Sequence, residues 1–545
     1  MRLTHFLGYR ARSGVIQTVL ACGVVCGLPE HSIAQSAQPQ TQQAPAKTAP
    51  RHPKEPKEPD DPNSPRALLI SSHFGSQNLR PGDLTYLLEM ESDMAAMITP
   101  DLCRQWSREL LAFASTLPPS WDRLAAQKNA LVALSSVDAK EAFELFPKMD
   151  IPVPLADGRL REDLRADGAT TVFVEYWKHD KSAAALSGLR EQANKLGNTG
   201  QYPYLAMQPI LQDVIQKNEM EGEAIFLETL VYYRRRSIID REDDDFREFL
   251  NASWGSLTDP LRRMALTAAV NRLLNESDTT KDGEIFSGSI KTGKGTRPFQ
   301  NKAQMLLYQL MPTIQEFDHK WAEQLAEDHP SLKDASASDS HAGTMTILFD
   351  LNNTPSSAIA GLQTMASQSS IYNSAISVAA KDPDSALLMA PQLDASHQAA
   401  LYAEIASYVY PKDAARASSL MSVADERIKN MNDPYARFQA LISYAQAALK
   451  QKDDGRYKKA IDDGFSLGLE LISEELQAHP QEWVYQTKVF SGLEQLATID
   501  MRAEDDKALT RIRAIGNEAV RSILLAESAS VEKTLREQRA SHATQ

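Results

Sequence analysis

Apolar residues recur with the period of an α-helix over most of the chain after residue 82. The first apolar face carries Leu84, Leu87, Leu88, Met94 and Ile98. Offsets of three and four residues place such side chains on one side of a helix with 3.6 residues per turn. Similar faces follow nearly to the end of the chain, so the pattern predicts an all-α protein.

Polar residues and prolines mark where the predicted helices begin. Thr99, which is followed by a proline, caps a helix whose apolar face covers 102–117. Another helix is predicted over 121–134. Asp138 opens the next one and has a glutamate three residues later, the pattern of a capping box. A separate helix is predicted over 301–311.

The helix starts also recur along the chain. The sequences TPSSA at 354–358, DPDSA at 382–386 and DAARA at 413–417 share a capping side chain followed by alanine four residues later. Their capping residues lie 28 and 31 positions apart. Looser copies stand at 137–142 and 503–508. A regular distance between helix starts is typical of a chain built from repeated helical units.

Alanine-rich helices at 398–408 and 439–449 resemble each other and suggest the other helix of each unit. A period of about 30 to 45 residues is the length of one helical hairpin. The chain therefore resembles the tetratricopeptide and HEAT-like α-superhelical repeat proteins, mainly over 354–525 and more loosely over 83–146. The resemblance implies stacked antiparallel helical hairpins, an α–α superhelix. It concerns architecture only, because the tryptophan–leucine–glycine–tyrosine positions of a tetratricopeptide repeat are not found. The alternative is an irregular helical bundle.

Changes in composition divide the chain and separate two helical halves by long loops. The predicted parts are a signal peptide at 1–34, a disordered Pro-rich linker at 35–65, an N-terminal helical region at 66–276, a flexible loop at 277–298, connecting helices at 299–333, a loop at 334–343 and a C-terminal helical repeat region at 344–545.

The N-terminus has the pattern of a secretory signal. Basic residues precede the apolar run 15–28, and small residues around Ala34 suit signal peptidase. The run is shorter than the ~20 residues that span a bilayer, and no later segment is apolar enough to do so. The sequence VLAC at 19–22 resembles a bacterial lipoprotein box, so a lipid anchor at Cys22 is the alternative to cleavage. We therefore expect an exported protein, periplasmic or extracellular.

Charge and cysteine content exclude some classes of function. The 545 residues carry a formal charge of −14 at pH 7, which disfavours nucleic acid as a partner. Two of the three cysteines lie in the predicted signal peptide. Cys103 remains and has apolar neighbours at helical spacing, so we expect a small core residue and no internal disulfide.

Gly288, Gly293 and Lys294 have the spacing of a phosphate-binding P-loop. That loop needs a buried strand before it and a serine or threonine directly after the lysine. Here the preceding residues are polar and Gly295 follows the lysine. The KTG motif at 291–293 also resembles that of penicillin-recognising enzymes, but the S-x-x-K sequence at 530–533 lies in the wrong order. Both interpretations fail.

Two acidic segments are candidates for cation binding. Asp278, Thr280 and Asp282 match the first ligand positions of a calcium loop, but Ser289 replaces the glutamate at position 12. This predicts a solvated turn. The acidic run 240–248 follows the basic residues of 232–237, and we expect these opposite charges to neutralise each other.

The sequence assigns no catalytic, cofactor-binding or metal-binding residue. The histidines are dispersed and none has zinc-ligand spacing; those of the mature region include His73, His179, His319, His329, His341, His397 and His479. Trp106 and Trp177 are expected in helical apolar faces. The first hypothesis is a protein-binding scaffold. The alternative is an enzyme on a helical toroid that acts on carbohydrate or peptidoglycan through a carboxylate pair.

Overall fold

The computed structural model describes residues 61–76, 78–151, 164–235, 241–277, 284–292, 295–299, 301–333, 335, 344–350, 356–503 and 507–543. Most of the described chain is helical, which confirms the predicted all-α, superhelical class. The predicted signal peptide and the predicted linker up to residue 60 lie outside the described residues. The first helix begins at Pro65 with Ser64 as its cap, one residue before the predicted boundary at 66.

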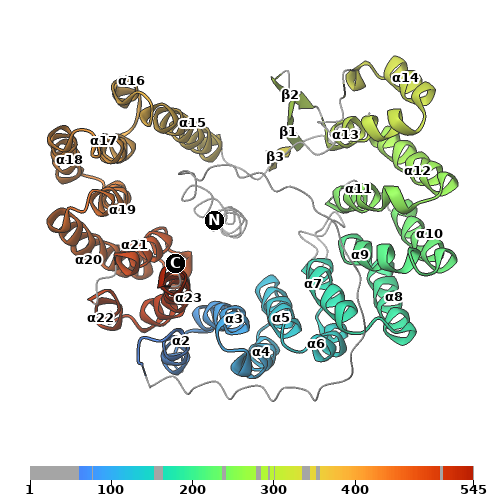
Figure 1. The fold of residues 1–545 in the computed structure, drawn as a ribbon, viewed down its shortest axis with the longest axis horizontal. Helices are drawn as coiled ribbons and strands as arrows, with labels where there is room; N and C mark the ends of the chain where they lie inside the picture. Colours follow the sequence, from blue (N-terminus) through green and yellow to red (C-terminus); the bar gives the residue numbers. More distant parts are fainter. Residues whose placement is uncertain are drawn as a thin grey trace, which may run out of the picture.

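The helices are arranged around a ring in two layers, and a small sheet lies between α13 and α15 (Figure 1). The inner layer contains α3 Pro81–Ile98, α5 Trp121–Ser135, α7 Leu164–His179, α9 Tyr204–Ile215, α11 Arg241–Ser253, α13 Lys302–Phe317, α15 Ser356–Ala379, α17 Ala395–Val409, α19 Pro434–Lys450, α21 Phe490–Arg502 and α23 Glu518–Ala543. The outer layer contains α2 Pro65–Phe74, α4 Pro100–Ala114, α6 Ala139–Leu145, α8 Ala183–Asn198, α10 Glu219–Arg235, α12 Asp259–Ser277, α14 His319–Asp328, α16 Pro383–Leu387, α18 Ala414–Lys429, α20 Asp454–Ala478 and α22 Lys507–Arg513.

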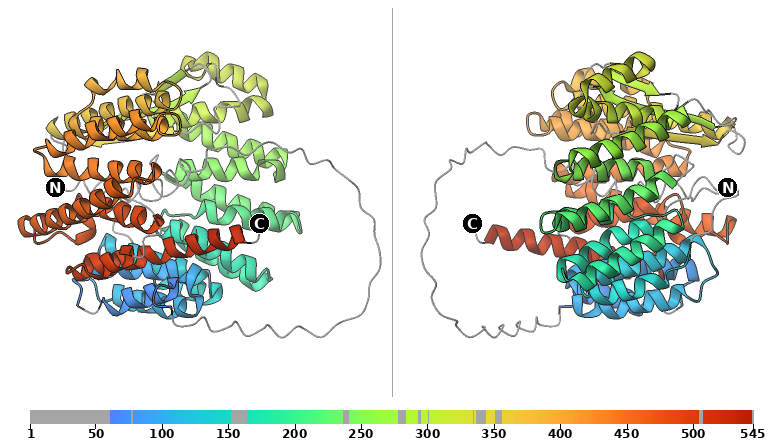
Figure 2. Two further views of the ribbon diagram at one scale, coloured as in Figure 1. Left: turned by 60° about the vertical axis from the view of Figure 1, so that its left-hand side comes forward. Right: turned by 90° about the vertical axis from the view of Figure 1, so that its right-hand side faces the viewer.

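The helix axes run roughly along the axis of the ring (Figure 2). Short connections therefore carry the chain back and forth between the two layers, as in a stack of helical hairpins. Short 3-10 helices lie in some connections: η1 Phe146–Lys148, η2 Trp254–Ser256, η3 Pro330–Leu332, η5 Ala390–Gln392 and η6 Val484–Gln486. Among the described residues, no helix is long and apolar enough to cross a membrane.

The two ends of the chain meet and complete one unit of the ring. The outer helix α2 packs on the inner helix α23, although they lie at opposite ends of the sequence (Figure 1). The Oγ atom of Ser72 lies 2.9 Å from the carbonyl oxygen of Ser522, and Asp61 pairs with Arg536. The inner helix α23 from the C-terminus and the outer helix α2 from the N-terminus thus form a pair that resembles one of the helical hairpins.

The hydrophobic core crosses this junction. One buried cluster contains Leu68, Leu87 and Trp106 together with residues 375–529, and a second cluster covers residues 124–332. The N-terminal helices α2 to α4 therefore share their core with the C-terminal arc. The division of the chain into the parts given above stays a prediction.

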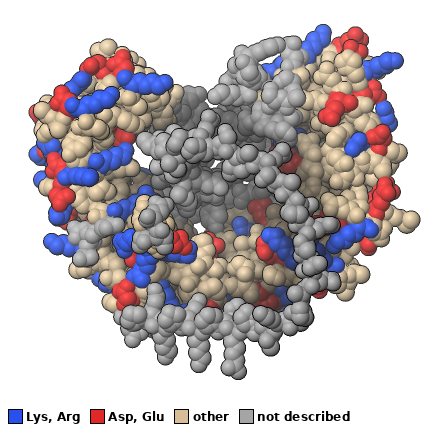
Figure 3. Space-filling model, viewed as in Figure 1, with Lys and Arg blue, Asp and Glu red and all other residues tan. Residues whose placement is uncertain are grey.

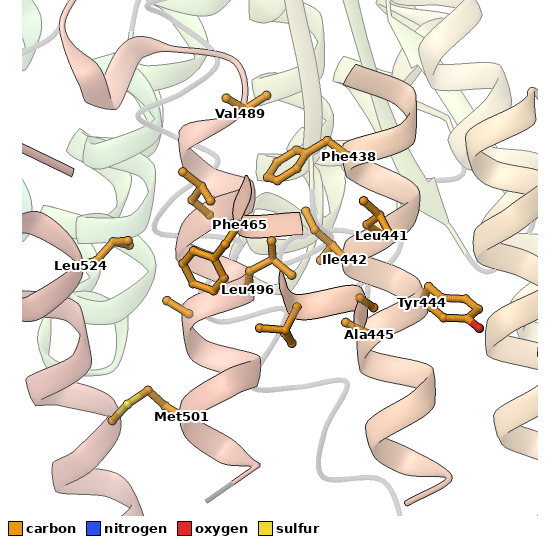
Figure 4. Close-up of a cluster of buried hydrophobic side chains, with 14 of the residues drawn as sticks. Phe438, Leu441, Ile442, Tyr444, Ala445, Phe465, Val489, Leu496, Met501 and Leu524 are labelled. Carbon is orange, nitrogen blue, oxygen red and sulfur yellow. The ribbon is translucent and has the colours of Figure 1, made fainter. Parts of the chain in front are cut away.

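Small residues let neighbouring helices of the C-terminal arc approach closely. The buried ring of Phe438 on α19 lies against α21 and α20 (Figure 4). A Cβ atom added at Gly492 would lie 2.4 Å from this ring, and one added at Gly468 would lie 2.7 Å from it. Glycine lowers helix stability by about 1 kcal/mol relative to alanine. Here it provides the space that a large aromatic side chain fills.

Several predicted helix boundaries are confirmed. Asp138, Asp382 and Asp413 each accept a hydrogen bond from the backbone N–H three residues later, at 3.0, 3.1 and 2.9 Å. The similar alanine-rich segments form α17 and α19, which pack side by side in the inner layer. The helix predicted over 301–311 is longer than expected. It continues past Pro312 as α13 because buried Ile314 extends its apolar face.

The structure corrects the predicted flexible loop at 277–298. Helix α12 reaches Ser277, and the strands β1 Glu284–Thr292 and β2 Gly295–Phe299 pair antiparallel. Strand β3 Thr344–Asp350 pairs with the other edge of β1, so the order is β2-β1-β3. The sheet packs on α13, where Phe299 contacts Tyr308 with ring centroids 5.3 Å apart. The sequence did not predict these strands because the alternation of apolar and polar residues in a short, mostly polar segment is a weak signal. The strand β3, which pairs with β1, is also distant in sequence.

Candidate functional site

The residues with P-loop spacing do not form a phosphate-binding loop. Gly288 lies within β1, opposite Phe299 on one side and Thr346 on the other. Gly293 and Lys294 lie outside the described residues. A P-loop leads from a strand into a helix, whereas here the strand is followed by an antiparallel strand.

The acidic segments pair with cations of the same chain. Asp243 is buried and accepts hydrogen bonds from Arg272 at 2.7 and 3.1 Å, and Asp244 lies 2.6 Å from Lys302. The expectation that this run neutralises the preceding basic residues is therefore wrong for these two carboxylates, whose partners come from α12 and α13. Of the partial calcium loop, 278–283 lies outside the described residues and Ser289 is paired within β1.

Cys103 is a core residue, as predicted. Its side chain is fully buried, and its Sγ atom lies 3.5 Å from the carbonyl oxygen of Ala133. Burial raises the pKa of the thiol, which disfavours the nucleophilic thiolate. Trp106 and Trp177 are buried as well.

One of the dispersed histidines lies in a buried polar cluster where the two chain ends meet. The Nδ1 atom of His73 on α2 lies 2.7 Å from Glu91 on α3, and its Nε2 atom lies 3.5 Å from Glu109 on α4. The imidazole stacks on Trp106 with ring centroids 4.7 Å apart. Ser72 Oγ lies 2.6 Å from Glu91, so the cluster links α2, α3, α4 and, through Ser72, α23.

The charges of this cluster depend on each other. Burial raises the pKa of Glu91, although its hydrogen bonds to His73 and Ser72 oppose the shift. Burial lowers the pKa of His73, but the hydrogen bond and the charge of Glu91, together with Glu109, outweigh it and raise the pKa. A proton between the two side chains is therefore held more tightly in the folded protein than in the unfolded chain.

A second contact closes the ring beside this cluster. Asp83, at the start of α3, accepts a hydrogen bond of 2.7 Å from the backbone N–H of Val484 and pairs with Arg80. The Arg80 guanidinium stacks on Trp483 at 4.9 Å and donates to the carbonyl oxygen of Glu482. We call α2, α3, residues 480–487 and α23 the clasp.

The clasp does not have the geometry of a glycosidase site. Its buried carboxylates with raised pKa, Asp83 and Glu91, stand eight residues apart on α3, or about 12 Å along the helix axis. Each is saturated by hydrogen bonds within the clasp, and Glu91 is 0% exposed. A cleaving pair would need both carboxyl groups to face one substrate from a cleft.

An open depression lies between α17, α18 and α19. It has a volume of about 590 Å³ and is open to solvent. Its lining residues come from the starts of α17 and α19 and the end of α18, and we call it the α17–α19 groove; they are Ala395, Val423, Glu426, Arg427, Asn430, Met431, Asn432, Asp433 and Ala436. A second depression, of about 370 Å³, lies over α3 and α4 and is mostly apolar.

The groove offers hydrogen-bonding groups of both kinds. Arg427 stacks on Tyr402 at 4.9 Å and donates to Gln398, but its buried Nε atom has no hydrogen-bond partner within the protein. Asn430 and Asn432 add amide donors and acceptors, and Asp433 caps α19. Such a mixture matches the alternating N–H and C=O groups of an extended polypeptide.

The sequence analysis assigned no functional role to the residues of the His73 cluster or of the α17–α19 groove. His73 and Glu91 come from different helices, and the groove joins three helix ends. The sequence signal that was available is the capping pattern of helix starts, which places Asp433 and the end of α18 beside each other. It gives no indication that the adjoining side chains leave a depression.

Charged side chains of both signs are interspersed over the face of the ring in Figure 3. Among the residues that the structure describes, no group of three or more His, Cys, Asp or Glu side chains is placed to hold a metal ion.

No protein-family model and no curated protein matches the chain. One solved structure, a circular tandem repeat protein described as having a novel repeat topology and enhanced subunit contact surfaces, aligns over 87% of this chain and 99% of its own. The sequence identity is 13% and the TM-score is 0.20. At this score the alignment carries no weight, and the helical repeat architecture stands on the packing of this chain's own helices.

Proposed function

We propose that the protein is an exported helical-ring scaffold that binds another polypeptide. The α17–α19 groove is the docking site, and an extended segment of the partner fills it. The observation that carries this proposal is the open groove lined by Arg427, Asn430, Asn432 and Asp433, side chains that offer both donors and acceptors. Such groups can pair with the N–H and C=O groups of a partner's backbone.

The size and polarity of the groove support the same class of partner. Its volume of about 590 Å³ lies within the range of sites that hold small ligands or short peptide segments. Its walls are formed by helix ends, which are held by caps and change little on binding. The support for export is the basic start, the apolar run and the small residues around Ala34.

Site-specific photocrosslinking in the producing cell tests the proposal. A photoreactive amino acid replaces Asn432 in the groove, and in a matched control it replaces exposed Leu388 on the connection after α16. We expect one polypeptide to be crosslinked from position 432 and not from position 388. The Arg427→Ala variant should lower the yield at least about tenfold, since a hydrogen bond to a charged group contributes about 1.5–3 kcal/mol.

The same preparation also tests export. Mass spectrometry of the purified protein should give a mature N-terminus at Gln35, whereas a lipid-modified Cys22 would show the alternative processing. A yield at position 432 that equals the yield at 388, or that Arg427→Ala leaves unchanged, would exclude the groove as the docking site. Release of sugar fragments from peptidoglycan by the purified chain would favour the enzyme instead.

A further inference from the structure

The outer face of α10 carries an apolar stripe that faces solvent. Met220 is 81% exposed, Leu227 39% and Val231 44%, and half-buried Ala224 lies between them. Their offsets of four, three and four residues place them in one narrow row. Helix α10 is part of the outer wall, between α8 and α12, which faces the viewer in the right-hand view of Figure 2.

The charges at the two ends of this stripe are opposite. Glu219 and Glu221 lie in the first turn of α10, and Arg234 and Arg235 lie in its last turn. This order stabilises an isolated helix through its dipole, so the charges alone need no partner. The apolar row between them has no such explanation, because about two fifths of Leu227 and Val231 and most of Met220 remain exposed to solvent.

The stripe is complementary to itself when two copies of α10 run antiparallel. A two-fold axis beside Leu227 places Met220 and Glu221 next to the partner's Arg235 and the partner's Arg234. The same axis sets Ala224 against the partner's Val231. An interface with two-fold symmetry requires this property, since each residue must fit its counterpart in both directions. Antiparallel helix dipoles also attract each other.

We propose that a second copy of this chain covers the α10 stripe, so that the protein forms a two-fold symmetric dimer through α10. The two rings then lie edge to edge with their axes antiparallel. Met264 on the neighbouring helix α12 is 44% exposed and widens the apolar area on one side.

The area of the stripe sets the expected affinity. One helix face with its flanks buries less than the about 800 Å² per partner of a standard interface. We therefore expect a reversible dimer with a dissociation constant on the order of 10 μM. This inference does not depend on the α17–α19 groove, which lies on the opposite arc of the ring (Figure 1).

Sedimentation velocity of the full mature chain from about 1 to 200 μM tests the dimer. We expect the wild type to shift from monomer to dimer across this range. Leu227→Arg places two like charges next to the axis and should raise the dissociation constant at least about 100-fold. The matched control is Leu388→Arg, an equally drastic change at a site 78% exposed on the other arc, which should leave the equilibrium unchanged.

A charge exchange makes the test specific for the antiparallel arrangement. One variant carries Arg234→Glu and Arg235→Glu, and another carries Glu219→Arg and Glu221→Arg. Each alone should stay monomeric, and an equimolar mixture should dimerise again. Circular dichroism verifies that all variants keep the helical content of the wild type. A wild type that stays monomeric at 200 μM, a dimer unaffected by Leu227→Arg, or a mixture that does not associate would overturn the proposal.

Discussion

His73 connects the two ends of the chain through side chains that are distant in sequence. Its partner Glu91 lies 18 residues away, and Ser72 reaches Ser522, 450 residues away. Ser72 has one proton and two acceptors close by, Glu91 and the carbonyl oxygen of Ser522.

The pH dependence of the clasp follows from these shifts. The pKa of His73 is raised above its ordinary value of 6.5, so the stability that it contributes is complete below pH 6.5. That contribution is lost as the pH rises through the folded-state pKa. The raised pKa of Glu91 acts in the same direction, since the stability that it contributes is complete below its ordinary value of 4.5 and is lost as the pH rises through the folded-state pKa.

We expect His73→Gln to weaken this pH dependence, because it removes the contribution of His73 and leaves that of Glu91. At pH 6 the variant should unfold with a free energy about 1–3 kcal/mol lower than the wild type, because Glu91 loses its hydrogen-bonded partner while it stays buried. The difference should become smaller as the pH rises, because His73 of the wild type loses its proton. Urea unfolding followed by circular dichroism at pH 6, 7 and 8.5 measures both effects. An equal difference at all three values would contradict the assigned role of the histidine.

Some residue roles could be predicted from the sequence and others could not. Cys103 was identified as a core residue because its neighbours along one helix define a buried face. His73 was counted among the dispersed histidines because its environment is formed by two other helices, α3 and α4. Local periodicity reports which side of a helix is buried. It does not report which polar groups meet across helices.

At the scale of the helices and strands, the capping pattern predicted where helices begin, but it did not distinguish the starts of inner helices from those of outer helices. Asp382 and Asp413 begin the outer helices α16 and α18, and Asp453 begins the next outer helix, α20. Thr354, which was grouped with the first two, lies outside the described residues and precedes the inner helix α15. Both layers use the same kind of cap, so the sequence alone mixes inner and outer starts.

The sheet shows the other limit of sequence analysis. Strand β1 has small and polar residues at most positions, and only Ile290 is described as buried. Its pairing with β3 joins segments separated by the helices α13 and α14. Strand pairing between distant segments leaves no local pattern, whereas each helix makes its hydrogen bonds within itself.

Close packing of α19 on α21 gives a test at this scale. Gly492→Ala places a Cβ atom 2.4 Å from Phe438 and 2.8 Å from Ile442. Overpacking of this kind costs about 1–3 kcal/mol, which exceeds the gain of about 1 kcal/mol from replacing glycine in a helix. The variant should therefore unfold at lower urea concentration than the wild type.

Gly255→Ala in η2 is the matched control, because nothing lies within 4 Å of the added Cβ atom. Its stability should stay within about 0.5 kcal/mol of the wild type. Equal or higher stability of Gly492→Ala would mean that α19 and α21 are farther apart than described.

At the scale of the whole molecule, the sequence predicted a superhelix but not its closure. The hairpin period, the alanine content and the caps are local, and they are compatible with an open or a closed stack. Closure depends on several contacts between the ends of the chain, among them α2 on α23, α3 on α23, and Asp83 with the backbone of Val484. A ring closed in this way contributes stability to both arcs, since neither terminal helix has an exposed end face.

Asp83→Ala should open the clasp. The substitution removes the acceptor of the buried Val484 N–H and the partner of Arg80, and we expect a loss of about 2–4 kcal/mol. Asp83→Asn keeps an oxygen for the Val484 N–H and should therefore be less harmful. Small-angle X-ray scattering of the full mature chain, read below the concentration at which copies associate, should show a larger maximum dimension for the alanine variant.

The control for this test is Asp243→Asn, which disturbs a buried ion pair with Arg272 inside one arc. It should lower the unfolding midpoint by a similar amount and leave the scattering curve of the native state unchanged, because the contacts between the chain ends remain. An alanine variant at Asp83 that loses stability with the same maximum dimension as the wild type would show that α2 and α23 hold the ring closed without the second contact. Substitutions at the interface of α2 and α23 would then be needed to open the ring.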